Sequence, residues 1–280
     1  MILDGKALST KVKDRVKQEI SNLPKNDNIP TLAVVLVGDD PASAIYVRNK
    51  KKACEYVGIK SVSVTLGQDT TQEKLEQTLN DLNNDKSING ILLQLPLPKG
   101  LDERKALNCI APEKDVDGLS SVNLGKLITK EVGITPCTPT GVMEFFKEYN
   151  IDLTGKNVVI INRSILVGKP LALMMLNANA TITISHSKTQ NISEYTKKAD
   201  VIVTAVGKAK FLTEDMVKDG AVVIDVSIVR TEAGLCGDAD YENIKNKASY
   251  ITPVPGGVGP MTIAMLMENT LKAYKLQNNI

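Results

Sequence analysis

The sequence predicts an α/β fold: a first α/β domain, followed by a domain with a doubly wound parallel sheet. Short runs of valine, leucine and isoleucine alternate with stretches of helical periodicity, as in sheets that helices cover on both faces. A length of 280 residues suggests about two domains. Because the alternation restarts after residue 136, we expect domains at 1–136 and 137–259, with residues 260–280 packing back on the first domain.

In the expected first domain, residues 5–22 have the apolar spacing of a helix. The almost entirely apolar run "TLAVVLVG" then predicts a buried strand. Pro41 marks the start of the next helix and Gly58 its end. "SVSVTL", a polar helix near 71–84 and the strand-like "GILLQLPLP" continue the alternation.

The expected second domain begins with "TPCTPTGVMEFFKEYN", after which the strand pattern restarts. Four apolar runs predict its strands: "KNVVIIN", "TITISH", "DVIVTAVG" and "AVVIDVS". Helices are expected from about Lys169 and near 192–198, which makes a Rossmann-like sheet. The last segment, "MTIAMLMENTLKAYKL", is amphipathic, and its methionines at 261, 265 and 267 are expected to fill the core.

Composition excludes several classes of protein. The 34 basic residues nearly balance the 32 acidic ones, so no electrostatic footprint for nucleic acid is present. The four cysteines are far apart and His186 is the only histidine, which leaves no disulfide framework and no metal site. With no signal peptide and no run long enough to span a bilayer, we expect a soluble cytoplasmic protein.

One lysine of the helix that starts at Pro41 is expected on its buried side. At about 100° per residue, an apolar stripe forms from Tyr46, Val47, Ala53, Cys54 and Val57. Lys50 falls inside this stripe, whereas Arg48, Lys51 and Lys52 face away from it. Burial would lower the pKa of Lys50 and suit it to proton transfer. The alternative is that only its methylene stem is buried and its amine reaches water.

Three further motifs have two interpretations each. Gln94 must be satisfied internally or face a cleft at its strand end, and the cleft is favoured. Asp115 and Asp117 of "PEKDVDGLS" either cap a turn, the default, or bind paired N–H donors of a ligand. "TPVPGGVGPMT", with Thr262 as the first hydroxyl of the following helix, is either a platform for a flat ligand or an ordinary turn.

"VVIINRSILVGKP" lies where a dinucleotide-binding fold turns from its first strand into its first helix. Gly168 is its only glycine, and Asn162 stands at the sharp turn, where asparagine tolerates a left-handed conformation. Arg163 and Ser164 add a cation and a hydroxyl. The pattern departs from the usual glycine-rich motif and is weak by itself.

The end of the second strand of this domain indicates the cofactor. "ISHSKT" has no acidic residue to bind a ribose 2′-hydroxyl, whereas Ser187, Lys188 and Arg163 could accept a 2′-phosphate. NADP is therefore preferred to NAD, although these residues could also be an ordinary polar loop. His186 is interpreted as a loop residue and not as a catalyst.

Taken in order, the motifs resemble the bifunctional methylenetetrahydrofolate dehydrogenase/cyclohydrolase family over essentially the whole chain. They are "PASAIYVRNKKKACEYVGI", "GILLQLPLP", "PEKDVDGL", "TPCTPTGV", "NRSILVGKP", "HSKT" and "PGGVGPMT". The resemblance implies that Lys50, preceded by Tyr46, is the acid/base residue, that Gln94 tunes it, and that Asp117 recognises the pterin ring.

The same resemblance implies the remaining site residues and the reactions. Folate-site positions are Ser43, Tyr46, Asp117, Pro255, Gly256, Gly259 and Thr262; cofactor positions are Asn162, Arg163, Ser164, Gly168 and Ser187. It further implies NADP-dependent oxidation of methylenetetrahydrofolate, hydrolysis of the methenyl product in the same interdomain cleft, and a homodimer.

Asn162 departs from the family pattern, which has glycine before Arg-Ser, and this raises an alternative. The alternative is a cyclohydrolase whose dehydrogenase activity is weak or shifted to NAD. A shikimate-type dehydrogenase is a more remote enzyme alternative, and a catalytically silent member of the fold is another. A nucleic-acid-binding protein that uses the basic run at 48–52 is disfavoured by the near-zero net charge and by the absence of tryptophan for stacking.

Overall fold

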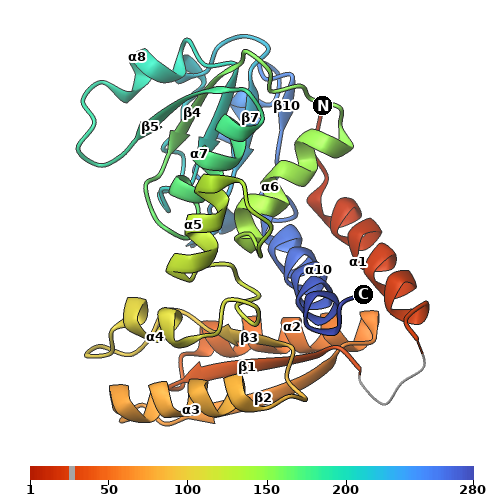
Figure 1. Cartoon of the computed structure of the whole chain (residues 1–280). Helices are drawn as coiled ribbons and strands as arrows, with labels where there is room; N and C mark the ends of the chain where they lie inside the picture. Colours follow the sequence, from red (N-terminus) through yellow and green to blue (C-terminus); the bar gives the residue numbers. More distant parts are fainter. Residues whose placement is uncertain (25–28) are drawn as a thin grey trace. The chain divides into compact units, whose positions relative to one another are not determined.

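The computed structural model describes residues 1–24 and 29–280, except for the side chains of residues 41–44 (Figure 1). The chain forms two compact units. We call residues 11–137 and 263–280 the first unit, and residues 1–10 and 138–262 the second unit. The sequence analysis placed residues 1–10 with the first domain; the structure groups them with the second unit.

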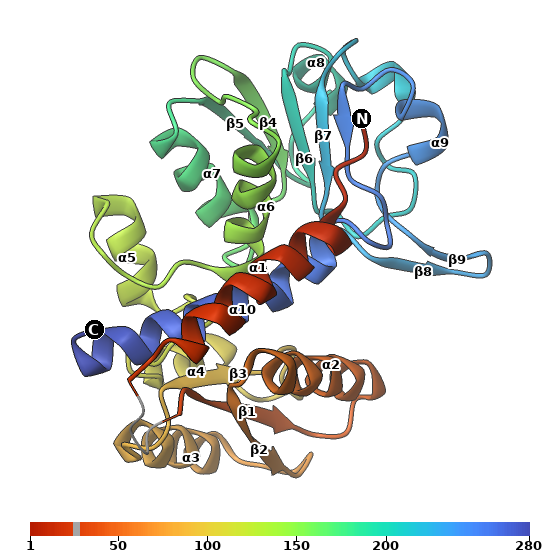
Figure 2. The ribbon, with the colours of Figure 1, turned by 90° about the vertical axis from the view of Figure 1, so that its right-hand side faces the viewer.

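The first unit contains a parallel three-stranded sheet in the order β2-β1-β3. Its strands are β1 (Thr31–Val37), β2 (Lys60–Leu66) and β3 (Gly90–Leu93). Apolar β1 is buried at the centre, whereas β2 is an edge strand with several exposed side chains. Figure 2 shows α2 (Pro41–Val57) and α3 (Gln72–Asn84) on opposite faces of this sheet. The expected alternation of strands and helices in this part of the chain is confirmed.

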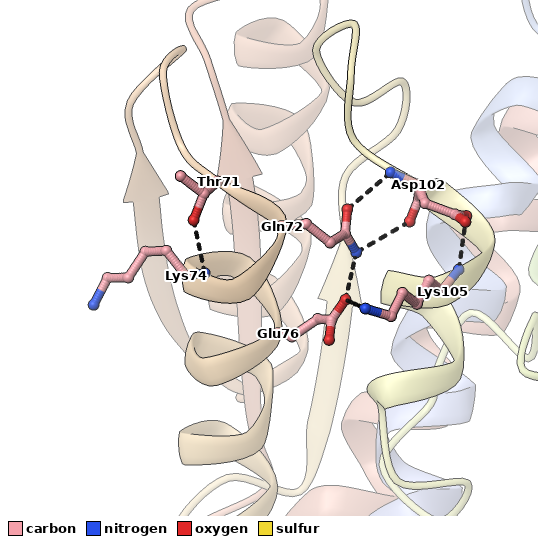
Figure 3. A network of polar contacts seen from close by, with 6 residues as sticks. All are labelled: Thr71, Gln72, Lys74, Glu76, Asp102 and Lys105. Carbon is pink, nitrogen blue, oxygen red and sulfur yellow. Dashed lines mark hydrogen bonds and ion pairs between the residues drawn. The ribbon is translucent and has the colours of Figure 1, made fainter.

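Polar contacts join the start of α3 to the start of α4 (Glu103–Cys109), as Figure 3 shows. Gln72 accepts a hydrogen bond at 2.8 Å from the backbone N–H of Asp102, and its own amide donates to Glu76 at 2.7 Å. Lys105 forms an ion pair with Glu76 at 2.8 Å. Asp102 caps α4 by accepting from the Lys105 N–H at 2.9 Å. These bonds align the two helices that cover one apolar face of the sheet.

The second unit contains a parallel five-stranded sheet in the order β10-β7-β6-β4-β5. The strands are β4 (Asn157–Ile161), β5 (Thr181–Ser185), β6 (Val201–Thr204), β7 (Val222–Asp225) and β10 (Tyr250–Ile251). Four of them and the doubly wound order match the expectation. Between the strands lie α7 (Gly168–Asn177), α8 (Ile192–Thr196), η1 (Glu214–Met216), the antiparallel hairpin β8 (Val229–Thr231) and β9 (Gly234–Cys236), and α9 (Tyr241–Ile244).

The first residues of the chain extend this second sheet beyond β10. Ile2 pairs in parallel with Ile251, the Leu3 N–H donates to the Ile251 carbonyl at 2.8 Å, and the Ile251 N–H donates to Met1 at 3.0 Å. The Lys6 N–H also donates to Gly256 at 3.0 Å. Backbone groups that β10 would otherwise leave unpaired at the sheet edge are therefore satisfied, which explains why residues 1–10 belong with the second unit.

The remaining helices are α1 (Gly5–Ser21), α5 (Ser121–Thr129), α6 (Cys137–Glu148) and α10 (Val258–Asn278). Helix α10 begins before the expected position, so Gly259 and Pro260 lie in its first turn, where the missing proline N–H is harmless. Met261, Met265 and Met267 are buried, as predicted. Residues 263–280 belong to the first unit, whereas residues 260–262, which were expected to pack with the first domain as well, belong to the second unit.

Candidate active site

In the first unit, the side chains of Lys50 and Gln94 are in direct contact. Lys50 Nζ donates a hydrogen bond to Gln94 Oε1 at 2.8 Å. Gln94 follows β3, its backbone N–H donates to Val35 at 2.9 Å, and its side-chain Nε2 donates to the Leu95 carbonyl at 2.6 Å. The amide is therefore satisfied internally, contrary to the expectation that it faces a cleft. Because Nε2 is bonded to a carbonyl, the amide oxygen is the atom that faces the lysine.

Burial shifts the pKa values around Lys50. It lowers the pKa of Lys50, and this change is opposed in part by the nearby carboxylate of Asp117. Burial also raises the pKa of Asp117, with Lys50 again acting in opposition. Lys50 is only partly buried, but its amine is hydrogen-bonded to Gln94, so the alternative in which the amine has water as its only partner is not what the structure shows. An amine of lowered pKa can accept and release a proton close to neutral pH.

Asp115 shapes the loop that carries Asp117. Its carboxylate accepts hydrogen bonds from the backbone N–H groups of Gly118 at 3.0 Å and Ser120 at 2.8 Å, and from Asn123 Nδ2 at 2.9 Å. Of the two aspartates in "DVDG", Asp115 thus takes the capping role expected by default. Asp117 accepts none of these loop hydrogen bonds, and it is the member of the pair that interacts electrostatically with Lys50.

Two residues that the sequence analysis missed complete this cluster. The buried thiol of Cys137 donates to the Val116 carbonyl at 3.3 Å. Its hydrogen bond to Asp117 acts to lower the pKa of that carboxyl, and its electrostatic interaction with Lys50 acts to raise the pKa of the amine. Asn269, on α10, donates to the carbonyls of Val116 at 3.0 Å and Thr135 at 2.9 Å. Asn269 could have been found, because it follows two buried methionines at a spacing of four residues on an otherwise apolar helix face.

The expectation for Tyr46 was wrong in one respect. Tyr46 is 44% exposed, although the helical wheel placed it on the apolar stripe, whose burial begins only at Ala53 and Cys54. A wheel gives the direction of a side chain but not how far the helix extends past the sheet it covers. Tyr46 still lies one turn before Lys50. Ser43 is in the same helix, but its side chain lies outside the described part of the structure.

The second unit has a pocket of about 560 Å³ at the carboxyl ends of three neighbouring strands of its sheet. It is lined by residues that follow β4, β5 and β6, including Arg163, His186, Ser187, Ala205 and Val206. A doubly wound sheet binds its ligand at this edge, where the connections from neighbouring strands diverge. The volume lies within the range of small-molecule and cofactor sites.

Asn162 organises the loop between β4 and α7. Its Oδ1 accepts from the Ser164 N–H at 2.8 Å, the Ser164 hydroxyl at 2.7 Å and the Gly168 N–H at 3.0 Å. Its Nδ2 donates to the Ala205 carbonyl at 2.6 Å. The expected left-handed backbone at Asn162 is not observed. Its side chain instead fixes the loop, because four hydrogen-bonding groups converge on one amide.

The other cofactor candidates divide between loop-forming and ligand-facing roles. A Cβ atom on Gly168 would lie 2.1 Å from the Asn162 carbonyl oxygen, so this position requires glycine. Ser164 Oγ accepts from the Val167 N–H at 3.1 Å. His186 Nδ1 accepts from the Lys188 N–H at 3.2 Å, which supports its predicted loop role. Arg163 has no hydrogen-bond or ion-pair partner among the described residues, and it lines the pocket with Ser187.

The glycine-rich candidates for the folate site belong to the second unit, whereas Lys50, Gln94 and Asp117 belong to the first. Pro255 is exposed and Gly256 has a φ of +108°, a conformation that favours glycine. The Thr262 hydroxyl lies 2.9 Å from that of Thr138, in the second turn of α10. Across the described residues, no helix combines the length and apolarity needed to cross a bilayer.

Comparison with known proteins gives a consistent assignment. Residues 3–117 match the catalytic domain of the tetrahydrofolate dehydrogenase/cyclohydrolase family, and residues 136–278 match its NAD(P)-binding domain. The bifunctional protein FolD of Campylobacter hominis is 56% identical over 98% of this chain and 97% of its own length. The FolD crystal structure from Campylobacter jejuni has a TM-score of 0.97 at 50% identity and covers 99% of both chains.

Two further structures bear on the cofactor and on the alternative function. FolD of Trypanosoma brucei, solved with NADP and an inhibitor, has a TM-score of 0.95 at 35% identity and covers 100% of this chain and 99% of that one. Shikimate dehydrogenase of Aquifex aeolicus, at 14% identity and a TM-score of 0.54 over 92% of this chain and 95% of that one, shares the fold alone. The chain belongs to the tetrahydrofolate dehydrogenase/cyclohydrolase family.

Proposed function

We propose that this protein carries out two successive reactions on folate-bound one-carbon units. The first oxidises methylenetetrahydrofolate to methenyltetrahydrofolate with NADP⁺. The second hydrolyses the methenyl compound to formyltetrahydrofolate. The observation that carries the proposal is the hydrogen bond of 2.8 Å from Lys50 to Gln94, at a lysine whose pKa burial lowers.

In the hydrolytic step, water attacks the cationic methenyl carbon and must lose a proton. The neutral amine of Lys50 accepts this proton and returns it to the ring nitrogen that leaves the carbon, while the hydroxyl on the carbon releases its remaining proton to solvent as the formyl C=O forms. Gln94 holds the amine in place through its amide oxygen and adds no charge. The lowered pKa of Lys50 also avoids a permanent ammonium beside a cationic ligand, which a fully exposed lysine would present.

Asp117 is proposed to recognise the pterin ring. The Asp117 carboxylate has about four acceptor positions, and the Cys137 thiol uses one of them, so two adjacent N–H donors of such a ring can still bind it in a bidentate manner. Asp115 accepts the loop N–H groups and so leaves Asp117 available. Tyr46, with its exposed ring one turn before Lys50, is proposed to contact the folate as well. Ser43, Pro255, Gly256, Gly259 and Thr262 remain candidate substrate-site residues on the family resemblance.

The pocket of the second unit fits NADP. When bound, NADP⁺ accepts the hydride from the one-carbon unit. Arg163, Ser187 and the adjacent Lys188 follow β4 and β5, and no acidic residue stands at the end of β5 to bind a 2′-hydroxyl. These residues suit a 2′-phosphate. The side-chain amide of Asn162 forms hydrogen bonds within its own loop, which favours a working dehydrogenase over the alternative of a cyclohydrolase with weak or NAD-shifted dehydrogenase activity.

The test follows absorbance of the methenyl compound in two mixtures, one with methylenetetrahydrofolate and NADP⁺ or NAD⁺, the other with preformed methenyltetrahydrofolate. We expect NADP⁺-dependent formation in the first and enzyme-dependent loss in the second. Lys50→Met should abolish the loss, whereas Lys51→Met, the exposed neighbour on the same helix, should retain it. Hydrolysis by Lys50→Met at the wild-type rate above background would refute the assigned role of Lys50.

The family resemblance also supports a homodimer that acts in the cytoplasm on tetrahydrofolate derivatives without a nucleic-acid partner. Light scattering coupled to gel filtration tests the dimer, and a mass of one chain would contradict it. A salt titration of binding to non-specific DNA tests the absence of a nucleic-acid partner, and salt-sensitive binding would contradict it.

A further inference from the structure

One buried carboxylate in the second unit accepts five hydrogen bonds. Asp238 is fully buried and lies between β9 and α9, outside the residues assigned to either reaction. Its Oδ2 accepts from the Thr204 hydroxyl at 2.7 Å, the Ser227 hydroxyl at 2.8 Å and the Val206 N–H at 2.6 Å. Its Oδ1 accepts from the N–H groups of Gly207 at 2.9 Å and Lys208 at 2.8 Å.

These donors come from one short segment, residues 204–208, and from Ser227 after β7. The segment follows β6, and two of its members, Ala205 and Val206, line the 560 Å³ pocket. Three successive backbone N–H groups, those of residues 206–208, point at a single carboxylate. Such a carboxylate fixes the course of the backbone much as a bound anion would.

The same segment is also tied to the loop between β4 and α7. Asn162 donates to the Ala205 carbonyl at 2.6 Å and accepts from the N–H groups of Ser164 and Gly168. A continuous chain of hydrogen bonds therefore runs from Asp238 through residues 205–208 to Asn162 and the start of α7. These hydrogen bonds hold two walls of the pocket: the segment that follows β6 and the loop between β4 and α7.

We propose that Asp238 is a positioning residue for the dinucleotide: its carboxylate sets the shape of the pocket wall formed by residues 205–208. This inference rests on the proposed function of the pocket as the NADP site. A carboxylate is needed because the three backbone N–H groups are fixed donors. The amide of asparagine has one oxygen and one NH₂ group, so in either orientation its NH₂ faces at least one of these N–H groups.

The experiment uses the full chain with Asp238→Asn, and with Asp240→Asn as a control at a nearby, partly buried aspartate that pairs with the exposed Lys210 and accepts no hydrogen bond from residues 204–208. Fluorescence titration with NADPH gives Kd, and steady-state kinetics give kcat and the KM of each substrate. The cyclohydrolase rate, which needs no NADP, measures the amount of folded enzyme. For Asp238→Asn we expect Kd for NADPH and KM for NADP⁺ to rise at least tenfold, with kcat at saturating NADP⁺ within threefold of wild type. Asp240→Asn should match wild type.

A merely structural role would instead lower kcat for both reactions in proportion to the loss of folded protein, with KM for NADP⁺ unchanged. That result, or wild-type NADPH affinity in Asp238→Asn, would overturn the inference alone. A wild-type protein that binds no NADPH would overturn the proposed function of the pocket as well.

If Asp238→Asn does not fold, Thr204→Val and Ser227→Ala carry the test, because each removes one hydroxyl donor to Asp238 and leaves the carboxylate in place; Ser227→Ala also removes the hydroxyl oxygen that accepts from the Gly207 N–H at 3.0 Å. Each should raise KM for NADP⁺ two- to fivefold, and unchanged values in both variants would overturn the inference.

Discussion

Replacing Gln94 by glutamate tests the proposed proton transfer most directly. The change places a carboxylate where the amide oxygen lies, 2.8 Å from Lys50 Nζ. At an effective dielectric constant of about 20, opposite unit charges at that distance attract by about 6 kcal/mol, equivalent to about 4 units of pKa. Because burying the new carboxylate opposes its ionisation, we expect the pKa of Lys50 to rise by about 2 units.

The expected effect on the rate follows from the sign of this shift. The neutral amine is the active form, so activity is present above the pKa of Lys50 and is lost as the pH falls below it. In wild type, burial lowers that pKa and brings active enzyme toward neutral pH. In Gln94→Glu, the acidic limb of the pH–rate profile, where activity is lost as Lys50 becomes protonated, moves to higher pH by about 2 units. At a fixed pH on this limb, the rate of the variant is therefore about 100-fold below that of wild type.

The assay is cyclohydrolase activity from pH 6 to 9.5, corrected for uncatalysed hydrolysis at each pH. Gln94→Leu is the control, because it removes the hydrogen bond without adding a charge. It should lower the rate without moving the limb to higher pH. If Gln94→Glu and Gln94→Leu show the same profile, the reasoning from the lysine pKa is refuted.

Three other predictions concern the loop, the sheet and the final helix. Asn162→Ala removes four hydrogen bonds and should raise Kd for NADPH at least about tenfold by fluorescence titration; unchanged affinity would contradict the assigned loop role. Burial raises the pKa of Asp225 from 3.8 to about 6, so its ionisation destabilises the fold above pH 6, and protonation restores stability as the pH falls from 6 toward 4. The test measures the free energy of unfolding of Asp225→Asn and of wild type by urea titration at pH 8 and at pH 4.5. The value for the variant minus that for wild type should be about 2 to 3 kcal/mol more positive at pH 8 than at pH 4.5, and an equal difference at both pH values would count against this prediction. Asn269→Leu leaves two backbone carbonyls without their donor and should lower the free energy of unfolding by about 2 to 4 kcal/mol, again by urea titration; a neutral effect would show that water replaces the donor.

The long elements could be predicted because periodicity reports which faces are buried. Strands such as "TLAVVLVG" and the helix that ends at Gly58 have enough residues for the pattern to be distinct. The two-residue strand β10 and the three-residue strands β8 and β9 do not, and β10 forms only through pairing with the distant strand β7. The pairing of residues 1–3 with β10 was missed for the same reason.

The site was predictable to the extent that a polar residue interrupts an apolar pattern. Lys50 and Gln94 do so within a helix stripe and at the end of a strand, and the structure brings them together. Asp238 interrupts no pattern, and its partners lie between 11 and 34 residues away in sequence. Asn162 is a third case. Its residue type indicated a turn, but asparagine can form a turn either through a left-handed backbone or through side-chain hydrogen bonds, and only the folded loop shows that the side chain does so here.

Both units are discontinuous in the chain, and this affects the order in which the protein can fold during synthesis. The second unit needs residues 1–10 together with 138–262, and the first needs 11–137 together with 263–280. The ribosome therefore releases nearly the whole chain before either unit has all its parts, and β10 must emerge before the first three residues gain their partners. Until then the edge of the second sheet is open to wrong pairing, so a slower supply of the last 30 or so residues should increase the need for chaperones.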